Sequence, residues 1–193
     1  MNLPNKLTIL RIAMIPIFVA VVFIEAIPFR FLIGAALFAL AAITDTLDGQ
    51  IARKRNLVTD FGKLFDPLAD KVFVVSALIS LLALTGGGIW KILFAIAVMI
   101  IIAREFLVTS LRLLVAGKGI VVAAGMMGKI KTTVQMIAII VILVENQFAA
   151  ELTKAMGFAH WLGYILMAVA VIATVISGAQ YMLAYKSYID PQK

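Results

Sequence analysis

Residues 44–70 read TDTLDGQIARKRNLVTDFGKLFDPLAD, and this stretch places four aspartates inside a very apolar chain. Asp45 and Asp48 are three residues apart, so both lie on one face of a helix. Asp66 and Asp70 are four residues apart and share a face of the next helix. With a turn near residues 57–58, an antiparallel hairpin would stack the carboxylates in two layers roughly 5 Å apart. One layer would hold Asp48 and Asp66, the other Asp45 and Asp70.

Four carboxylates this close together repel each other in a low dielectric, so they must take up protons or recruit cations. Oxygen ligands without nearby His or Cys favour hard divalent ions, Mg²⁺ or Mn²⁺, and two such ions about 3.5–4 Å apart suit the layers. The pattern predicts a two-metal site for phosphoryl transfer. The structural alternative is that the aspartates solvate helix ends or pair with neighbouring basic residues, namely Arg53, Lys54, Arg55, Lys63 and Lys71.

Small residues and an arginine lie beside the aspartates. Gly49 and Gly62 leave bare backbone next to the proposed metals, and Ala52 keeps the same neighbourhood small. Arg53 can offer a guanidinium fork to phosphate oxygens. The alternatives are helix packing for the glycines and orientation by charge for the arginine; either can hold alongside a site.

The composition is that of an integral membrane protein. Of the 193 residues 64% are hydrophobic, and the mean hydropathy is +1.11, too much apolar surface for a water-soluble core to absorb. The absence of cysteine excludes disulfides and thiolate sites. Because no linker or low-complexity stretch divides the chain, we expect one domain over residues 1–193.

Long apolar runs without strand-like alternation predict an all-α polytopic membrane protein. Six transmembrane helices are expected, at residues 6–25, 30–54, 60–84, 89–116, 128–145 and 158–186. Most basic residues fall on one side of this arrangement, and only Arg30, Lys91 and Lys154 lie in the opposite loops. The positive-inside rule then places both termini and the aspartate ends of the helices at the cytoplasmic face.

The pattern DxxDGxxAR, followed after eight residues by GxxxDxxxD, spans residues 45–70. It resembles the signature of the CDP-alcohol phosphotransferases, membrane enzymes that make phospholipids by displacing CMP from a CDP-alcohol. The resemblance implies a six-helix fold, a homodimer and an active site open to the cytoplasmic interface. It also implies roles for the matched residues: Asp45, Asp48, Asp66 and Asp70 hold two divalent ions, Asp70 is also the general base, and Gly49, Ala52, Arg53 and Gly62 cradle the cytidine diphosphate.

Further segments narrow the resemblance. NKLTILRIAMIP, IIAREFLVTSLR and GKIKTTVQM look like those of bacterial phosphatidylglycerolphosphate synthases, so the likeness covers residues 2–145. It implies an enzyme of the bacterial cell membrane that transfers the phosphatidyl group of CDP-diacylglycerol to sn-glycerol 3-phosphate. The products would be phosphatidylglycerol phosphate and CMP.

An acceptor that carries a phosphate needs cations at the site, and four basic residues lie at the expected cytoplasmic ends of two helices: Arg104, Arg112, Lys129 and Lys131. Arg104 and Arg112 are about 80° apart around a helix and some 12 Å along it, so both need not reach one phosphate. Lys129 and Lys131 differ by about 200°, so one of them should point inward. Arg112 and Lys131 are favoured as ligands; the alternative is four snorkelling charges at the membrane surface.

Three polar residues, near the starts of the expected helices 6–25 and 60–84, each have two possible roles. Asn5 and Thr8 share a stripe with Arg11, and they either hydrogen-bond the nucleotide or belong to an interfacial helix start. Thr59 either contributes a hydroxyl near the phosphates or caps the helix that follows.

Other functions are alternatives to phosphatidyl transfer to glycerol 3-phosphate. The same enzyme class could use inositol phosphate, phosphatidylglycerol, serine or choline as acceptor. A cation transporter also keeps carboxylates in the membrane, but it predicts acids spread through the membrane and inverted repeats, which are not apparent. The formal charge of +7 does not indicate nucleic-acid binding, because the basic residues follow the expected topology.

Overall fold

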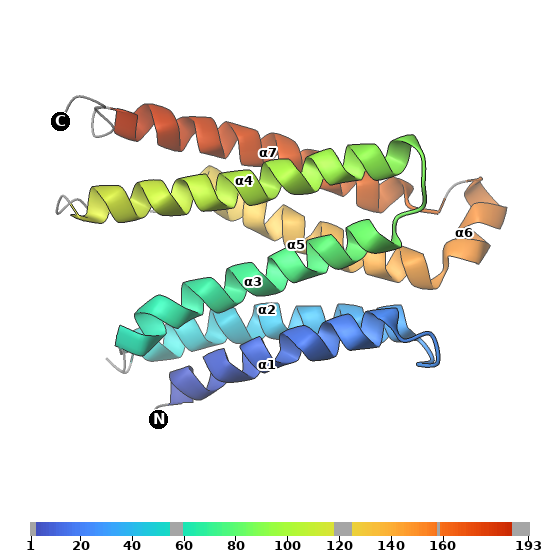
Figure 1. The fold of residues 1–193 in the computed structure, drawn as a ribbon, viewed down its shortest axis with the longest axis horizontal. Coiled ribbons are helices and arrows are strands. Elements are labelled where there is room, and N and C mark those ends of the chain that lie inside the picture. Colours follow the sequence, from blue (N-terminus) through green and yellow to red (C-terminus); the bar gives the residue numbers. More distant parts are fainter. Residues whose placement is uncertain (1–2, 55–59, 118–124, 158, 187–193) are drawn as a thin grey trace. The chain divides into compact units, whose positions relative to one another are not determined.

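A computed structural model describes residues 3–54, 60–117, 125–157 and 159–186, and only the backbone at 3–7, 45–54, 60–67, 70 and 116–117. Its described residues form seven helices and no strands: α1 (Leu3–Phe23), α2 (Arg30–Lys54), α3 (Asp60–Leu84), α4 (Ile89–Gly117), α5 (Met126–Gln147), α6 (Ala149–Met156) and α7 (Trp161–Tyr185). The all-α prediction is confirmed (Figure 1). The expected helices at 30–54 and 60–84 coincide with α2 and α3.

Three helices in the described part of the chain are long and apolar enough to cross a membrane. They cover Ile89–Val115, Met126–Gln147 and Trp161–Tyr185. The described side chains of α1, α2 and α3 give shorter apolar stretches, Thr8–Phe23, Arg30–Thr44 and Lys71–Leu84. An apolar helix of roughly 20 residues satisfies its own backbone in lipid, so this length and composition are those of a membrane protein.

The short helix α6 lies where only a connection was expected. Ala149–Met156 has no buried residue, and it ends at Gly157, whose φ of 75° is left-handed. The Gly157 N–H donates to the carbonyl of Thr153 at 2.9 Å, as is usual for a glycine that ends a helix.

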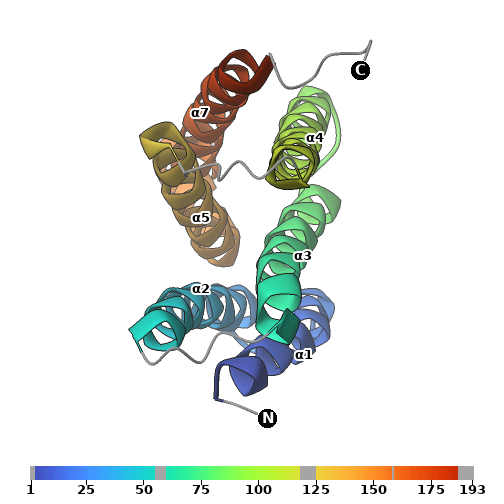
Figure 2. The same ribbon diagram turned by 90° about the vertical axis from the view of Figure 1, so that its left-hand side faces the viewer.

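The chain divides into two compact units. The first comprises Met1–Leu84 and Ile139–Gly163, the second Thr85–Ala138 and Tyr164–Lys193. In the first unit α1 packs against α2 and α3, and α2 and α3 run antiparallel (Figure 2). Phe18, Phe38 and Phe73 join the three helices, with ring centroids 5.5–6.3 Å apart.

The second unit contains α4, the first half of α5 and most of α7. A buried apolar group of Val108, Leu111 and Val115 on α4 packs against Tyr181 of α7. Tyr185 stacks on Tyr181, with centroids 6.4 Å apart and planes at 18°. This apolar base supports the polar residues of α4, α5 and α7 that are described below.

Candidate functional site

The helices α2 and α3 carry the aspartate pattern. The backbone of α2 includes Asp45, Asp48, Gly49, Ala52 and Arg53, and that of α3 includes Gly62, Asp66 and Asp70. The side chains of these eight residues, and the whole of Thr59, lie outside the described residues. Among the side chains that are described, no group of three or more acids or histidines could hold a metal ion. The metal ligands and their layers therefore stay a prediction.

The packing of α2 on α3 sets the backbone register of this hairpin. Phe38 of α2 and Phe73 of α3 stack with centroids 5.5 Å apart and planes at 16°. Asp45 follows Phe38 by seven residues and Asp66 precedes Phe73 by seven, which is two helical turns or about 10 Å in each case. Both positions thus lie toward the α2–α3 connection, on the helical faces that carry the two stacked phenylalanines. This backbone register sets Asp45 level with Asp66, about one helical turn from the predicted pairing of Asp48 with Asp66.

The polar stripe of α1 faces inward. Thr8 is 2% exposed and Arg11 is 4% exposed, on a helix that packs against α2 and α3. Burial of both side chains argues against an exposed helix start. The side chain of Asn5 lies outside the described residues, so its contact with a nucleotide stays a prediction.

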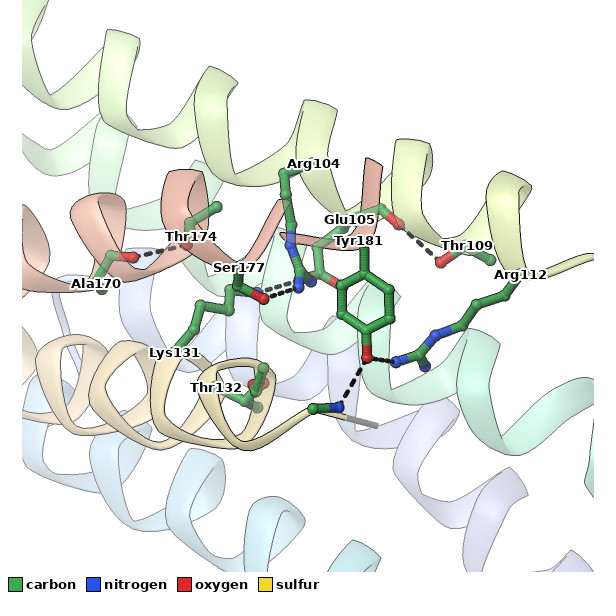
Figure 3. Close-up of polar contacts among 12 residues, drawn as sticks. Arg104, Glu105, Thr109, Arg112, Lys131, Thr132, Ala170, Thr174, Ser177 and Tyr181 are labelled. Atoms are coloured by element: carbon green, nitrogen blue, oxygen red, sulfur yellow. Dashed lines mark hydrogen bonds and ion pairs between the residues drawn. The ribbon is translucent and has the colours of Figure 1, made fainter. Parts of the chain in front are cut away.

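A second polar group lies in the other unit, where α4 and α5 contribute charged side chains and α7 contributes hydroxyl groups (Figure 3). Lys131 of α5 is 2% exposed, and its Nζ donates to the Glu105 carboxylate of α4. Arg104 Nη1 donates to the same carboxylate at 3.3 Å. Arg104 Nη2 donates to the hydroxyl of Ser177 on α7 at 2.5 Å.

Tyr181 of α7 lies at the centre of this group. Arg112 Nη2 donates to its hydroxyl oxygen at 2.6 Å, and the Gly125 N–H donates to the same oxygen at 3.0 Å. The guanidinium carbons of Arg104 and Arg112 lie 5.7 and 5.0 Å from the ring centroid, within the range of cation–π attraction. One side chain thus contacts both arginines and the residue before α5.

Among the described side chains of this group, cations outnumber anions. Arg104, Arg112 and Lys131 supply three cations, and Glu105, which contacts Arg104 and Lys131, supplies a carboxylate. Partly buried cations in excess of anions favour an anionic ligand, because such a ligand removes the repulsion. Guanidinium forks and an ammonium group are the usual partners of phosphate oxygens.

The four predicted basic ligands divide as follows. Arg104, Arg112 and Lys131 come together, whereas Lys129 is exposed. The expectation that only one of the two lysines points inward is confirmed. Tyr181 and Ser177 were not predicted; the available signal was the three-to-four-residue spacing of Thr174, Ser177 and Tyr181 within the apolar sequence of α7.

Comparison with known proteins assigns the chain to a family. The family model for CDP-alcohol phosphatidyltransferase matches residues 1–176. Several relatives carry the name CDP-diacylglycerol–glycerol-3-phosphate 3-phosphatidyltransferase, among them proteins of three organisms. The protein from Bacillus subtilis (strain 168) is 46% identical over 93% of both chains, that from Rickettsia bellii 39% over 97% of both, and that from Salmonella paratyphi A 37% over 95% of this chain and 94% of the relative. With the DxxDGxxAR pattern on α2 and GxxxDxxxD on α3, the chain belongs to the CDP-alcohol phosphatidyltransferase family.

Proposed function

We propose that this protein transfers the phosphatidyl group of CDP-diacylglycerol to sn-glycerol 3-phosphate and releases phosphatidylglycerol phosphate and CMP. The observation that carries this choice of acceptor is the group formed by Arg104, Arg112 and Lys131 around Tyr181, with Glu105 as counter-charge. The names of the relatives agree with it, since they state this donor and this acceptor.

The charge of the group suits a phosphorylated acceptor. Three cations and one carboxylate leave a formal charge of +2, which a phosphate monoester dianion would neutralise. Serine has no phosphate, and phosphatidylglycerol carries only one negative charge on its phosphodiester. Inositol phosphate is the alternative acceptor that the same cations would hold.

The donor would bind at the aspartate hairpin. Asp45, Asp48, Asp66 and Asp70 would hold two divalent ions, Mg²⁺ or Mn²⁺, since a set of carboxylate oxygens is the ligand type that these ions prefer. The ions would neutralise the negative charge of the donor's diphosphate. The cytidine nucleotide of CDP-diacylglycerol would be bound by Asn5, Thr8, Gly49, Ala52, Arg53, Thr59 and Gly62.

The reaction needs no covalent enzyme intermediate. The C1 hydroxyl oxygen of glycerol 3-phosphate attacks the phosphorus that bears the diacylglycerol, and the bond from that phosphorus to the CMP oxygen breaks. Asp70 accepts the hydroxyl proton as general base. Arg112 and Lys131, with Arg104, hold the acceptor phosphate so that the hydroxyl is oriented for attack.

The membrane arrangement is part of the proposal. α1 to α5 and α7 would cross the bilayer as six spans, with both termini and the active site at the cytoplasmic face of a bacterial cell membrane. The short helix α6 agrees with six spans, because its eight residues are too few to cross a bilayer and none of them is buried. The chain would act as a single domain and as a homodimer; cross-linking in native membranes would test the dimer.

The decisive experiment compares acceptors. The detergent-purified protein is given CDP-diacylglycerol with glycerol 3-phosphate, inositol phosphate, serine or phosphatidylglycerol, and CMP release is measured with Mg²⁺ and Mn²⁺ in parallel and after chelation. Release should require a divalent ion and glycerol 3-phosphate. Equal or faster release with another acceptor would refute the proposed function, and full activity after chelation would refute the metal site. Asp70→Asn should abolish release; near-normal activity would remove Asp70 as the base.

A further inference from the structure

Tyr181 contacts both arginines of the basic group, which comprises Arg104, Arg112 and Lys131. Its hydroxyl oxygen accepts from Arg112 Nη2 and from the Gly125 N–H. The phenolic oxygen thus accepts from two donors, one on α4 and one just before α5. Figure 3 shows the ring between Arg104 and Arg112, which approach it from different turns of α4.

The ring and the hydroxyl bring together two arginines that their own helix keeps apart. Arg104 and Arg112 are eight residues apart on α4, or about 12 Å along its axis. Both guanidinium groups nevertheless lie within 6 Å of the Tyr181 ring centroid. Gly178, one turn before Tyr181, lets Arg104 approach α7 closely, because a Cβ at this position would lie 3.2 Å from Cγ of Arg104. The stem of Arg104 therefore runs directly over the backbone of α7.

Three polar atoms of this group converge on one bare point of α5. A Cβ built on Gly128 would lie 3.8 Å from Ser177 Oγ and 3.9 Å from both Arg104 Nη2 and the Tyr181 hydroxyl. An ordinary methyl group would fit at that point. A phosphate oxygen farther out, at non-bonded distance from the Gly128 Cα, would meet the donors of a guanidinium and a serine hydroxyl.

We propose that Tyr181 is a positioning residue for the acceptor: it holds Arg112 by a hydrogen bond and Arg104 by its ring, so that both arginines meet one phosphate beside Gly128. This role rests on the proposed function. Tyr181 takes no part in the transfer itself. It selects acceptors that carry a phosphate, because without its hydroxyl the Arg112 guanidinium loses its fixed orientation and its affinity for a doubly charged group falls.

Tyr181→Phe tests the role, because it keeps the ring and removes only the oxygen. The KM for glycerol 3-phosphate should rise about tenfold, the scale of one hydrogen bond to a charged group. The KM for CDP-diacylglycerol and the kcat at saturating acceptor should stay within about twofold. A general structural defect would instead lower kcat or move both KM values. Tyr164→Phe makes the same substitution on α7 about 25 Å away and should leave all three constants unchanged.

Arg112→Lys gives a second, independent test. Lysine keeps the charge but loses the planar fork that the hydroxyl orients, so the acceptor KM should rise while the donor KM does not. The double variant with Tyr181→Phe should be no worse than Arg112→Lys alone, because both changes remove one interaction. If Tyr181→Phe does not fold, Arg112→Lys alone decides, and a wild-type acceptor KM refutes the proposal.

The proposed function and the role of Tyr181 would be refuted by different results. If the wild-type protein does not use glycerol 3-phosphate, the proposed function is wrong and the role of Tyr181 falls with it. If the wild type uses glycerol 3-phosphate but Tyr181→Phe has an unchanged acceptor KM, only the role of Tyr181 is refuted. Additive effects in the double variant would also refute it, since Tyr181 would then act independently of Arg112.

Discussion

Glu105→Gln removes the carboxylate that contacts Arg104 and Lys131 and keeps the size of the side chain. In the wild type, Lys131 Nζ donates to this carboxylate, and Arg104 Nη1 lies 3.3 Å from it. The Lys131 side chain is 3% exposed, so water cannot replace the lost partner. The substitution removes the carboxylate that Arg104 and Lys131 contact, and we expect it to destabilise the protein.

The size of the effect follows from charge and burial. Two opposite charges 4 Å apart attract by about 4 kcal/mol at an effective dielectric of 20. The Glu105 side chain is 21% exposed, and glutamine can still accept one hydrogen bond, so part of this attraction is already screened or is retained. Breaking a buried ion pair by changing one partner costs about 3 kcal/mol. We expect the free energy of unfolding to fall by about that amount.

The assay is equilibrium unfolding of the purified protein in mixed micelles with increasing denaturing detergent. Glu25→Gln is the matched control, because Glu25 contacts Arg30 at 3.8 Å and is 89% exposed. Such a surface pair contributes on the order of 0.5 kcal/mol. A Glu105→Gln variant as stable as the Glu25→Gln control would show that the carboxylate does not stabilise the group.

A double-mutant cycle separates the pair from its surroundings. Lys131→Met removes the buried cation, after which the loss of the Glu105 charge should cost much less. Glu105→Gln in the Lys131→Met background should therefore be milder by about 2 kcal/mol than in the wild type. Additive effects would contradict the pairing and with it the assignment of Lys131 to this group.

Four further substitutions, one of them a control, test other parts of the molecule. Lys131→Ala should raise the KM for glycerol 3-phosphate at least tenfold, whereas Lys129→Ala should leave it unchanged in the same CMP-release assay. Gly163→Ala should lower the free energy of unfolding by about 2 kcal/mol, since a Cβ there would lie 2.5 Å from Oε2 of Glu145; wild-type detergent resistance would contradict this. Gly128→Ala should fold normally, because its Cβ has ordinary contacts, but should raise the acceptor KM by filling the point where Ser177 and Tyr181 converge; an unchanged KM would place the phosphate elsewhere.

Local periodicity predicted those features that depend on one helix alone. The apolar runs and the turn between them gave the bounds of α2 and α3, because each helix in lipid must satisfy its own backbone. The angular spacing of Lys129 and Lys131 correctly placed one lysine inside and one outside. α6 was missed because its eight residues bury nothing, and a search for apolar spans does not detect a short polar helix.

The periodicity of the sequence does not predict contacts between helices that are far apart in the chain. Arg112 and Tyr181 are 69 residues apart and Arg104 and Ser177 are 73 residues apart. Angular spacing on α4 indicated only that the two arginines need not reach one phosphate. Their long side chains, together with a ring presented by α7, bring them to one place instead. Only the tertiary fold supplies this partner, so the aspartate pattern could be read from the sequence while Tyr181 could not.

The partners of two acids, the buried Glu145 and the partly exposed Glu105, favour a ligand site over a purely structural network at the basic group. Glu145 accepts from the N–H groups of Leu162 and Gly163 at 3.2 and 3.1 Å, so the first turn of α7 satisfies the carboxylate where it lies, as a helix N-terminus does. Glu105 instead faces two cations while Arg112 brings a third. A network that served stability alone would be expected to balance, because uncompensated buried charge is costly. We therefore expect an anion bound during the reaction to stabilise the protein by offsetting the positive charge of these described side chains.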